Sequence, residues 1–173
     1  RWWLTPSWAR QPSTRYSMFN AKSETAATLP SFREPYKRQR CVVPVSGFYE
    51  WARRQGHKQA YFLRSVENTG LLLAGLWDRW QGVDDAGQSH SIDSFTILTT
   101  SASPSMQTLH HRQPVLLDQE GARRWLDPNI ATAELEHFFA PQLVTSIEAR
   151  PVSSWVNNAP NKDLRCAQAI AES

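Results

Sequence analysis

Glu50 and His110 are the two side chains of this sequence best suited to proton transfer. Glu50 follows an apolar run and stands between the aromatic residues Tyr49 and Trp51. A carboxylate beside aromatic rings loses part of its hydration, which raises its pKa toward the range in which it can exchange protons. A histidine is a natural partner, because the environment can tune both groups toward neutrality. The alternatives are an exposed glutamate at a strand end and a histidine that makes only structural hydrogen bonds.

Asn20 is a third polar group next to an apolar segment, since it follows Met18 and Phe19. It joins Glu50 as a candidate for the chemistry, although an asparagine at such a place more often caps a helix or a turn. Cys41 is a possible nucleophile. It lies in an apolar run, however, where a thiol is normally inert packing.

The adjacent residues His110 and His111 raise the question of a metal site. Neighbouring residues seldom ligate one ion, and no cysteine or carboxylate stands at a ligand-like spacing nearby. We therefore expect no metal and no cofactor, and a metal-dependent hydrolase that uses both histidines is the weakest alternative. The sequence contains neither a nucleophile-elbow serine nor a glycine-rich phosphate loop.

Short strands and short helices must position these groups. Residues 41–45 read as a strand that turns at Ser46 and Gly47 and leads to Glu50. Further strands are expected at 60–64, 71–80, 94–100 and 115–117, with a β-like but proline-broken stretch at 144–156. Polar loops should join them at 53–58 and 82–90, and helices are expected at 103–109, 132–139 and, capped by Asp118, up to Leu126. This mixture predicts an α+β fold and a single domain over residues 1–173.

Composition limits the class of protein. The 173 residues are 40% apolar, enough for one domain with a sizeable core, and they include eight Trp. A net charge of +3 and a pI near 9.1 are compatible with nucleic acid, and residues 37–40 form a basic cluster that could contact phosphate or face solvent. Two cysteines fit a reducing cytosol, and the longest apolar stretch, 71–77, is too short to span a membrane. We expect a cytoplasmic protein.

The first residues, Arg-Trp-Trp-Leu-Thr-Pro-Ser-Trp, include no initiator Met and no polar lead-in. They read as though the chain starts inside a domain. We therefore expect that an upstream segment is missing.

Several motifs together resemble the SOS response-associated peptidase (SRAP) family. The opening is similar to that family's Arg-Trp-Gly-Leu-Ile-Pro-Ser-Trp. The others are Asn-Ala-Lys-Ser-Glu-Thr at 20–25, Phe-Arg at 32–33, Arg-Cys-Val-Val-Pro at 40–44, Gly-Phe-Tyr-Glu-Trp at 47–51, Ala-Gly-Leu-Trp at 74–77 and His-His-Arg-Gln-Pro at 110–114. Each motif is modest alone. They run in the right order over nearly the whole chain, and jointly they are specific.

The resemblance implies a compact α+β fold with a β-barrel-like core that binds single-stranded DNA and traps abasic sites. The family's nucleophile is an N-terminal Cys exposed by removal of the initiator Met. Its thiol and α-amine close on the opened sugar aldehyde to give a thiazolidine crosslink. The family is also described as autoproteolytic. The resemblance implies a monomer without an obligate protein partner.

Matching motifs imply roles for individual residues. Asn20 would hold the N-terminal Cys and the sugar, Glu50 would lie near the α-amine, and His110 would transfer protons. We expect these three side chains to converge in one groove, within about 12 Å of one another. The DNA contacts implied are Arg112 and Lys22 at phosphate, Trp51 and Thr99 near the pocket, and Trp2 or Trp3 in a wedge at the base stack.

The sequence also departs from the family pattern. Trp3 stands where the family usually has Gly, and Gln113 where it has Met, so packing near the site is expected to change. The family's Met-Cys-Gly-Arg opening is not among these residues. Cys41 cannot replace it, because an internal cysteine has no free α-amine. Two further alternatives are a non-catalytic module that binds single-stranded nucleic acid and an autoproteolytic hydrolase that uses Glu50 and His110.

Overall fold

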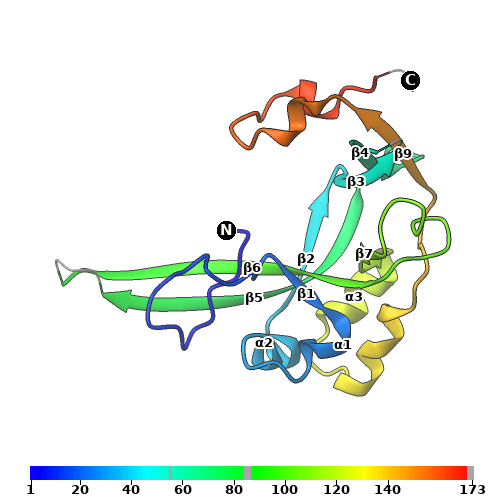
Figure 1. Ribbon diagram of the computed structural model, residues 1–173. Coiled ribbons are helices and arrows are strands. Elements are labelled where there is room, and N and C mark those ends of the chain that lie inside the picture. The colour runs from blue at the N-terminus through cyan, green and yellow to red at the C-terminus, as the bar shows by residue number, and fades with distance from the viewer. Residues whose placement is uncertain (55, 84–86, 171–173) are drawn as a thin grey trace. The chain divides into compact units, whose positions relative to one another are not determined.

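The computed structural model describes residues 1–54, 56–83 and 87–170. Its contacts divide the chain into two compact units, each built from three stretches of sequence. The first unit comprises Arg1–Val43, Leu72–Thr100 and Pro114–Ala140, and the second comprises Pro44–Leu71, Ser101–Gln113 and Pro141–Ser173. Two sheets and several short helices confirm the α+β class (Figure 1).

A six-stranded sheet has the order β1-β6-β5-β2 along its main path, with β7 paired to β6 and β8 paired to β5. The strands are β1 (Asn20–Lys22), β2 (Arg40–Val45), β5 (Leu71–Val83), β6 (Ser89–Ser101), β7 (Arg112–Pro114) and β8 (Leu116–Leu117). Strands β5 and β6 run antiparallel as a long hairpin, whereas β1 is parallel to β6 (Figure 1). The expected polar loop at 82–90 is shorter than predicted, because both strands continue into it. Its centre, 84–86, lies outside the described residues.

The helices of the first unit are short. They are α1 (Ser23–Ala26), α2 (Arg33–Arg38), α3 (Gln119–Leu126) and the 3-10 helix η1 (Thr132–Phe139). The predicted cap of α3 is confirmed, since the Asp118 carboxylate accepts the amide hydrogen of Gly121. The core of this unit gathers Leu4, Ala21, Leu76, Leu98 and Trp125 with smaller residues around them.

Arg40 is a buried structural residue, although the sequence places it in a basic cluster. Its side chain donates hydrogen bonds to the main-chain oxygens of Tyr36, Lys37, Trp125 and Asp127 at 2.6–3.1 Å. These oxygens lie in or just after the last turns of α2 and α3, where carbonyls lack partners within the helix. One guanidinium therefore holds two helix ends at the start of β2.

The second unit contains a three-stranded antiparallel sheet, in the order β3-β4-β9. Its strands are β3 (Phe48–Arg54), β4 (His57–Ser65) and β9 (Ile147–Val152). One face carries Phe48, Ala52, Tyr61 and Leu63 into a core shared with residues 102, 106, 109, 143 and 147. The chain ends in two 3-10 helices, η2 (Ser154–Asn157) and η3 (Leu164–Ala167).

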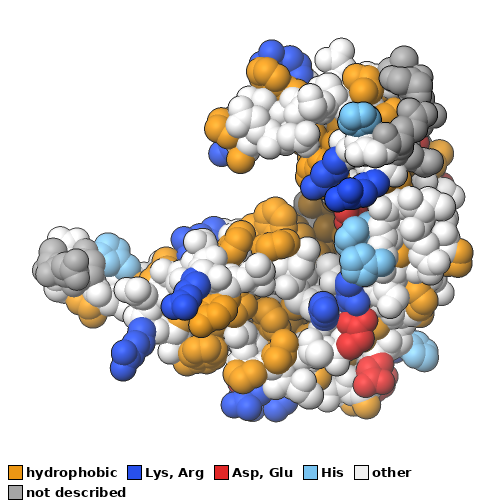
Figure 2. Space-filling model, in the orientation of Figure 1, with side chains coloured by type: hydrophobic (Ala, Val, Ile, Leu, Met, Phe, Trp, Pro, Cys, Tyr) orange, Lys and Arg blue, Asp and Glu red, His pale blue; other side chains and the backbone are white. Residues whose placement is uncertain are grey.

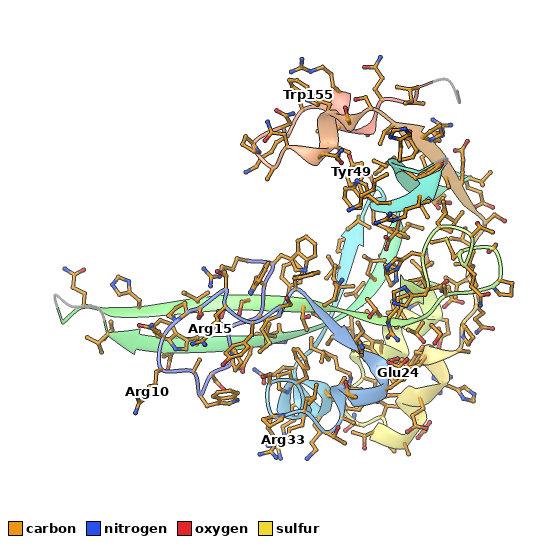
Figure 3. The ribbon with its side chains drawn as sticks, viewed as in Figure 1. Arg10, Arg15, Glu24, Arg33, Tyr49 and Trp155 are labelled. Atoms are coloured by element: carbon orange, nitrogen blue, oxygen red, sulfur yellow. The ribbon has the colours of Figure 1, made fainter. Side chains whose placement is uncertain are left out.

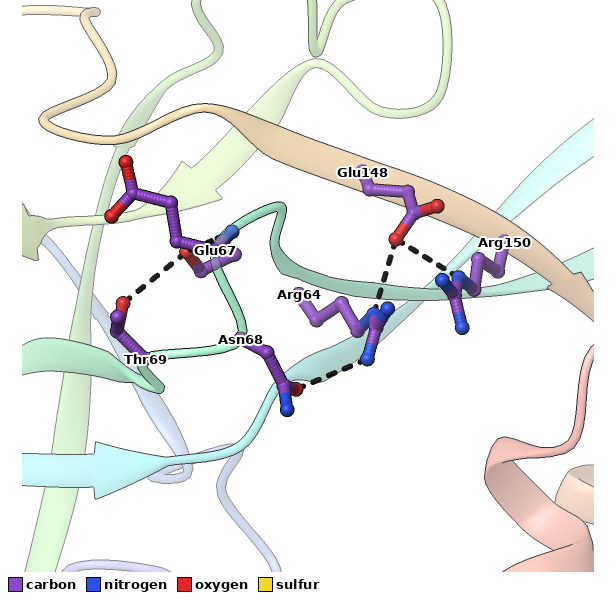
Figure 4. Close-up of polar contacts among 7 residues, drawn as sticks. Arg64, Glu67, Asn68, Thr69, Glu148 and Arg150 are labelled. Atoms are coloured by element: carbon purple, nitrogen blue, oxygen red, sulfur yellow. Dashed lines mark hydrogen bonds and ion pairs between the residues drawn. The ribbon is translucent and has the colours of Figure 1, made fainter.

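An ionic network links β4 to β9 on the opposite face of this sheet (Figure 4). Glu148 accepts hydrogen bonds from Arg64 Nε at 3.1 Å and Arg150 Nε at 2.9 Å. Arg64 also donates to Asn68 Oδ1 at 3.0 Å, which ties the strand to the turn that follows it. The two arginines hold the pKa of Glu148 below its usual range.

One expected helix is wrong, and another lies where it was predicted. Residues 104–109 form successive turns rather than a helix, and residues 132–139 form a 3-10 helix. In the first case the amide of Ser103 is bound by the side chain of Gln113, and the chain must turn at His110 to enter β7. The turns at 104–109 therefore run between two fixed ends, the bound Ser103 amide and the bend at His110.

Within the described residues, no helix is long and apolar enough to cross a membrane.

Replacing Arg40 by alanine is expected to lower the free energy of unfolding by about 3 kcal/mol, because four main-chain oxygens lose their donor. The matched control is Arg38→Ala on α2, where the side chain is exposed. Urea unfolding of both variants measures the difference. Equal stabilities for the two variants would contradict the structural role of Arg40.

Gly47→Ala is expected to destabilise the protein by about 1–3 kcal/mol through overpacking. A Cβ atom at this position would lie 2.4 Å from the main-chain oxygen of Leu63 and 2.5 Å from the Phe62 ring. The neighbouring Ser46→Ala is the control, because Ser46 is exposed. Thermal unfolding tests the prediction, and a Gly47→Ala protein as stable as Ser46→Ala would refute it.

Candidate active site

The pleat of β3 places Glu50 on the core-facing side of the three-stranded sheet. Phe48 and Ala52, two positions before and after it, both pack in the core of the second unit. Because side chains alternate along a strand, Glu50 shares their face. Its register partner on β4 is Tyr61, which belongs to the same core. Glu50 is therefore carried by the strand into a half-buried position.

The turns at 104–109 bring His110 to the same core. Met106 and Leu109 pack there beside Tyr61 and Ala52. Main-chain bonds from the amides of Leu109 and His110 to the oxygen of Met106 close the last turn. His110 directly follows Leu109, so these contacts fix the main chain that carries its imidazole.

The carboxylate of Glu50 and the imidazole of His110 meet in the second unit. His110 Nδ1 lies 3.7 Å from Glu50 Oε1, and the side chains are 36% and 21% exposed respectively. The pair is thus partly shielded from water while remaining open to a ligand. The distance suits an ion pair whenever the imidazole carries a proton.

Burial raises the pKa of Glu50 above its ordinary value, because desolvation disfavours the carboxylate. Three weaker effects oppose this rise: attraction to His110, a main-chain hydrogen bond from Trp51 and attraction to Lys58. Desolvation dominates. A glutamate of this kind holds and releases protons closer to neutral pH than a solvated one.

His110 Nδ1 has a partner in either protonation state. It lies 3.2 Å from the amide nitrogen of Arg112 and 3.1 Å from the carbonyl oxygen of the same residue. The neutral ring can accept from the amide at Nδ1, and the protonated ring can donate to the carbonyl. Nδ1 therefore keeps a main-chain partner in either form of the ring.

The His111 ring lies against this imidazole, with centroids 4.3 Å apart and ring planes tilted by 44°. In the described parts of the chain, no group of three or more His, Cys, Asp or Glu side chains is arranged to hold a metal ion. Cys41 is partly buried, and burial raises the pKa of its thiol to about 11. The thiol is therefore protonated near neutral pH and a poor nucleophile.

Asn20, Lys22 and Thr99 lie in the first unit, on the paired strands β1 and β6. Asn20 and Lys22 are exposed on the same side of β1, while Thr99, the register partner of Lys22, is buried. The Thr99 hydroxyl donates to the oxygen of Ala21 at 3.4 Å. The convergence of Asn20 with Glu50 and His110, and the roles of Lys22 and Thr99 at DNA, stay predictions.

Trp2 and Trp3 are both fixed against Phe19, immediately before Asn20. The Trp2 indole donates to the oxygen of Phe19 at 2.7 Å and remains 53% exposed. Trp3 adopts φ of +90°, a left-handed conformation that favours glycine and costs a larger residue about 1–2 kcal/mol. Its amide and its indole hold it there by donating to main-chain oxygens at 3.0 Å. The wedge role of either ring stays a prediction.

Trp51 lies on the opposite face of β3 from Glu50, since adjacent residues of a strand point to opposite sides. Its indole Nε1 donates to Asn157 Oδ1 at 2.8 Å, and Lys58 Nζ lies 5.4 Å from its ring centroid. Arg112 is half-buried in β7, and its main chain anchors His110. Their contacts with DNA stay predictions.

Sequence reasoning marked Gln113 only as a change in packing near the site, and it missed Lys58 and Asn157. Gln113 is buried, accepts from the amide of Ser103 at 2.8 Å and donates to the oxygen of Gln142 at 3.0 Å. It thereby fixes the start of the turns that carry His110. The signal in the sequence was that Gln113 stands where the family has Met. Lys58 and Asn157 gave none, because the Lys58 contact depends on the register of β3 and β4 and Asn157 lies 106 residues from Trp51.

The fold and the pair together define an α+β protein in which a carboxylate and an imidazole meet in a partly shielded position. The family model described as SOS response associated peptidase (SRAP) matches residues 1–159, and the chain belongs to this family.

Similar proteins carry related names. The chain is 34% identical over 163 residues to "Abasic site processing protein YoqW" of Bacillus subtilis, covering 93% of this chain and 71% of that relative. It is 32% identical to "Abasic site processing protein HMCES" of Gallus gallus, covering 98% of this chain and 56% of that relative. A crystal structure of a protein from Bacteroides thetaiotaomicron superposes with a TM-score of 0.83 at 30% identity, over 98% of this chain and 75% of that one.

The raised pKa of Glu50 predicts the sign of a pH effect on stability. Because the folded protein binds the proton of Glu50 more tightly, its contribution is fully present below the unfolded pKa, about 4.3. It is lost as pH rises through the higher folded pKa. Glu50→Gln cannot undergo this change, so wild type should lose stability relative to Glu50→Gln as pH rises from about 4 to about 8.

Denaturant unfolding across this pH range is the measurement. Glu67→Gln, at an exposed position of the turn after β4, is the control for removing one carboxylate. A stability difference between wild type and Glu50→Gln that stays constant or grows with pH would contradict the sign.

Proposed function

We propose that this protein processes abasic sites in single-stranded DNA. In the intact protein, an N-terminal cysteine outside these 173 residues would form a thiazolidine crosslink with the opened sugar. Residues 1–173 would act as one SRAP-like domain, as a monomer in the cytoplasm and on nucleoid DNA under damage. The observation that carries the proposal is the half-buried pair of Glu50 and His110, 3.7 Å apart. Family membership and the names of the relatives support the choice of substrate.

The proposed chemistry needs proton transfer at each step. Opening the sugar hemiacetal removes a proton from the anomeric hydroxyl and delivers one to the ring oxygen. The aldehyde then loses water as it condenses with the α-amine, and the thiol adds to the resulting carbon–nitrogen double bond. Glu50 has a pKa raised by burial, and His110 keeps a main-chain partner in both of its forms. Both properties suit a proton shuttle.

Binding would rest on separate aromatic and cationic contacts. Lys and Arg side chains form small groups spread over the face shown in Figure 2. In the N-terminal segment, Arg10 and Arg15 project from the same stretch as the exposed rings of Trp2 and Tyr16 (Figure 3). Stacking on aromatic rings and neutralisation of phosphates together give binding that tolerates any base sequence. Trp2 or Trp3 would form the wedge, Lys22 and Arg112 would contact phosphate, and Asn20 and Thr99 would line the sugar pocket.

The test is incubation of the full-length protein, including its N-terminal cysteine, with an abasic single-stranded oligonucleotide. A covalent species should appear on a denaturing gel with abasic DNA and not with an undamaged oligonucleotide. Glu50→Gln and His110→Gln should each slow its formation about 100-fold, the lower range for loss of a general acid–base group. Absence of the shifted band with the wild-type protein would contradict crosslinking. An unchanged rate of crosslink formation in Glu50→Gln would contradict the role of Glu50.

The same pair supports a second candidate function, removal of the protein's own leading residue, which the family's description as a peptidase favours. Mass spectrometry of the full-length wild-type protein should then show loss of the initiator Met that Glu50→Gln retains. Equal processing in both proteins would remove this candidate. A protein that binds abasic DNA without either reaction would be a non-catalytic binding module.

A further inference from the structure

The indole of Trp51 is held by a hydrogen bond at its edge and has a lysine ammonium over one face. At the edge, Nε1 donates to Asn157 Oδ1 at 2.8 Å. Over the ring, Lys58 Nζ lies 5.4 Å from the centroid. The register partner of Trp51 is Ala60, so Lys58 is its diagonal neighbour across the β3–β4 pair and shares its face. The side-chain amide of Asn157 thus orients the indole ring, and the Lys58 ammonium lies over it.

The ring of Tyr49 lies against Trp51, and Phe62 in turn lies against Tyr49. Tyr49 contacts Trp51 with centroids 6.4 Å apart and Phe62 with centroids 5.1 Å apart. All three rings lie on the same face of the sheet, because Tyr49 and Phe62 are register partners and Trp51 is two residues further along β3. The contact with Tyr49, which Phe62 supports, limits rotation of the half-exposed indole away from its position.

Asn157 comes from a segment that is braced by its own contacts. It is the last residue of η2, whose start is capped by the Ser153 hydroxyl. Asn161 Nδ2 donates to the oxygen of Trp155 at 2.8 Å, and the Arg165 guanidinium stacks on the Trp155 ring at 4.0 Å. Trp155 and Tyr49 are labelled in Figure 3, on η2 and β3 of the same unit. The amide that orients Trp51 is therefore itself held in place.

We propose that Trp51, Lys58 and Asn157 form a subsite for one unpaired nucleotide of the bound DNA strand. The Trp51 ring stacks on the base, Lys58 contacts the adjoining phosphate, and Asn157 is a positioning residue that acts through Trp51. A nucleotide presents a π face and an anion within one unit of the chain, which matches this ring and this cation. The inference rests on the proposed function, and it adds two residues, Lys58 and Asn157, that lie outside the motifs quoted above.

The experiment measures binding of a single-stranded oligonucleotide with a tetrahydrofuran abasic analogue, by fluorescence anisotropy from about 50 mM to about 200 mM salt. Lys58→Gln should reduce the slope of log affinity against log salt by about 0.7, the value for one phosphate contact on a single strand. Lys58→Arg keeps the charge and should keep the slope. Arg123→Gln, which removes an exposed cation paired with Glu120 on α3, is the control and should leave the slope unchanged.

Trp51→Phe and Asn157→Ala test the positioning role together. Each removes one side of the indole–amide bond, so each should weaken binding by a similar factor, on the order of threefold to tenfold, without changing the salt slope. The double variant should bind like either single variant, because Asn157 acts only through the indole nitrogen. Trp51→Ala removes the stack and should weaken binding about 5- to 150-fold. Thermal unfolding checks that each variant is folded. If Trp51→Ala does not fold, the comparison of Trp51→Phe with Asn157→Ala is sufficient to test the positioning role.

The outcomes separate the two proposals. A wild-type protein that does not bind the oligonucleotide at any salt overturns the proposed function and the subsite with it. Wild-type binding with an unchanged salt slope in Lys58→Gln, or with independent effects of Trp51→Phe and Asn157→Ala, overturns the subsite alone.

Discussion

The two-residue period of β3 is the constraint on which both parts of the candidate site depend. Phe48 and Ala52 are drawn into the core of the second unit, so Glu50 between them must share their face. Trp51, one residue on, must take the other face, where Tyr49, Lys58 and Asn157 surround it. A single slip in register would exchange the two faces and expose the carboxylate. The hydrophobic pattern of one strand thus places a half-buried carboxylate and a half-exposed indole on opposite faces of the sheet.

Hydrogen bonds from side chains to main-chain oxygens are a second feature that recurs in the fold. Arg40 satisfies oxygens at the ends of α2 and α3, and the indoles of Trp2, Trp3, Trp80 and Trp125 each donate to a main-chain oxygen. Such bonds fix large side chains in orientation while satisfying acceptors that the short helices and irregular N-terminal segment leave unpaired. The high tryptophan content of the chain therefore serves structure as well as exposing ring faces. At Trp3 the same bonds hold a backbone conformation that favours glycine.

Much of the fold could be predicted from local pattern. Alternation at 94–100 and the capping aspartate at 118 indicated β6 and α3, since both signals act over a few residues. The helix predicted at 103–109 was wrong because the bond between Gln113 and the Ser103 amide bridges ten residues and overrides local propensity. The basic cluster at 37–40 concealed the burial of Arg40, whose acceptors at 125 and 127 are remote in sequence.

For the site, the sequence by itself determined the residue types, the motif order and hence the family, because these depend on the identity and spacing of side chains along the chain. It also marked Glu50 and His110 as candidates. Only the tertiary structure decided that they meet at 3.7 Å, that Glu50 is half-buried, and that Asn157 and Lys58 hold Trp51. The reason is physical: desolvation and contact at long sequence separation arise from packing of distant segments, and no local pattern encodes them.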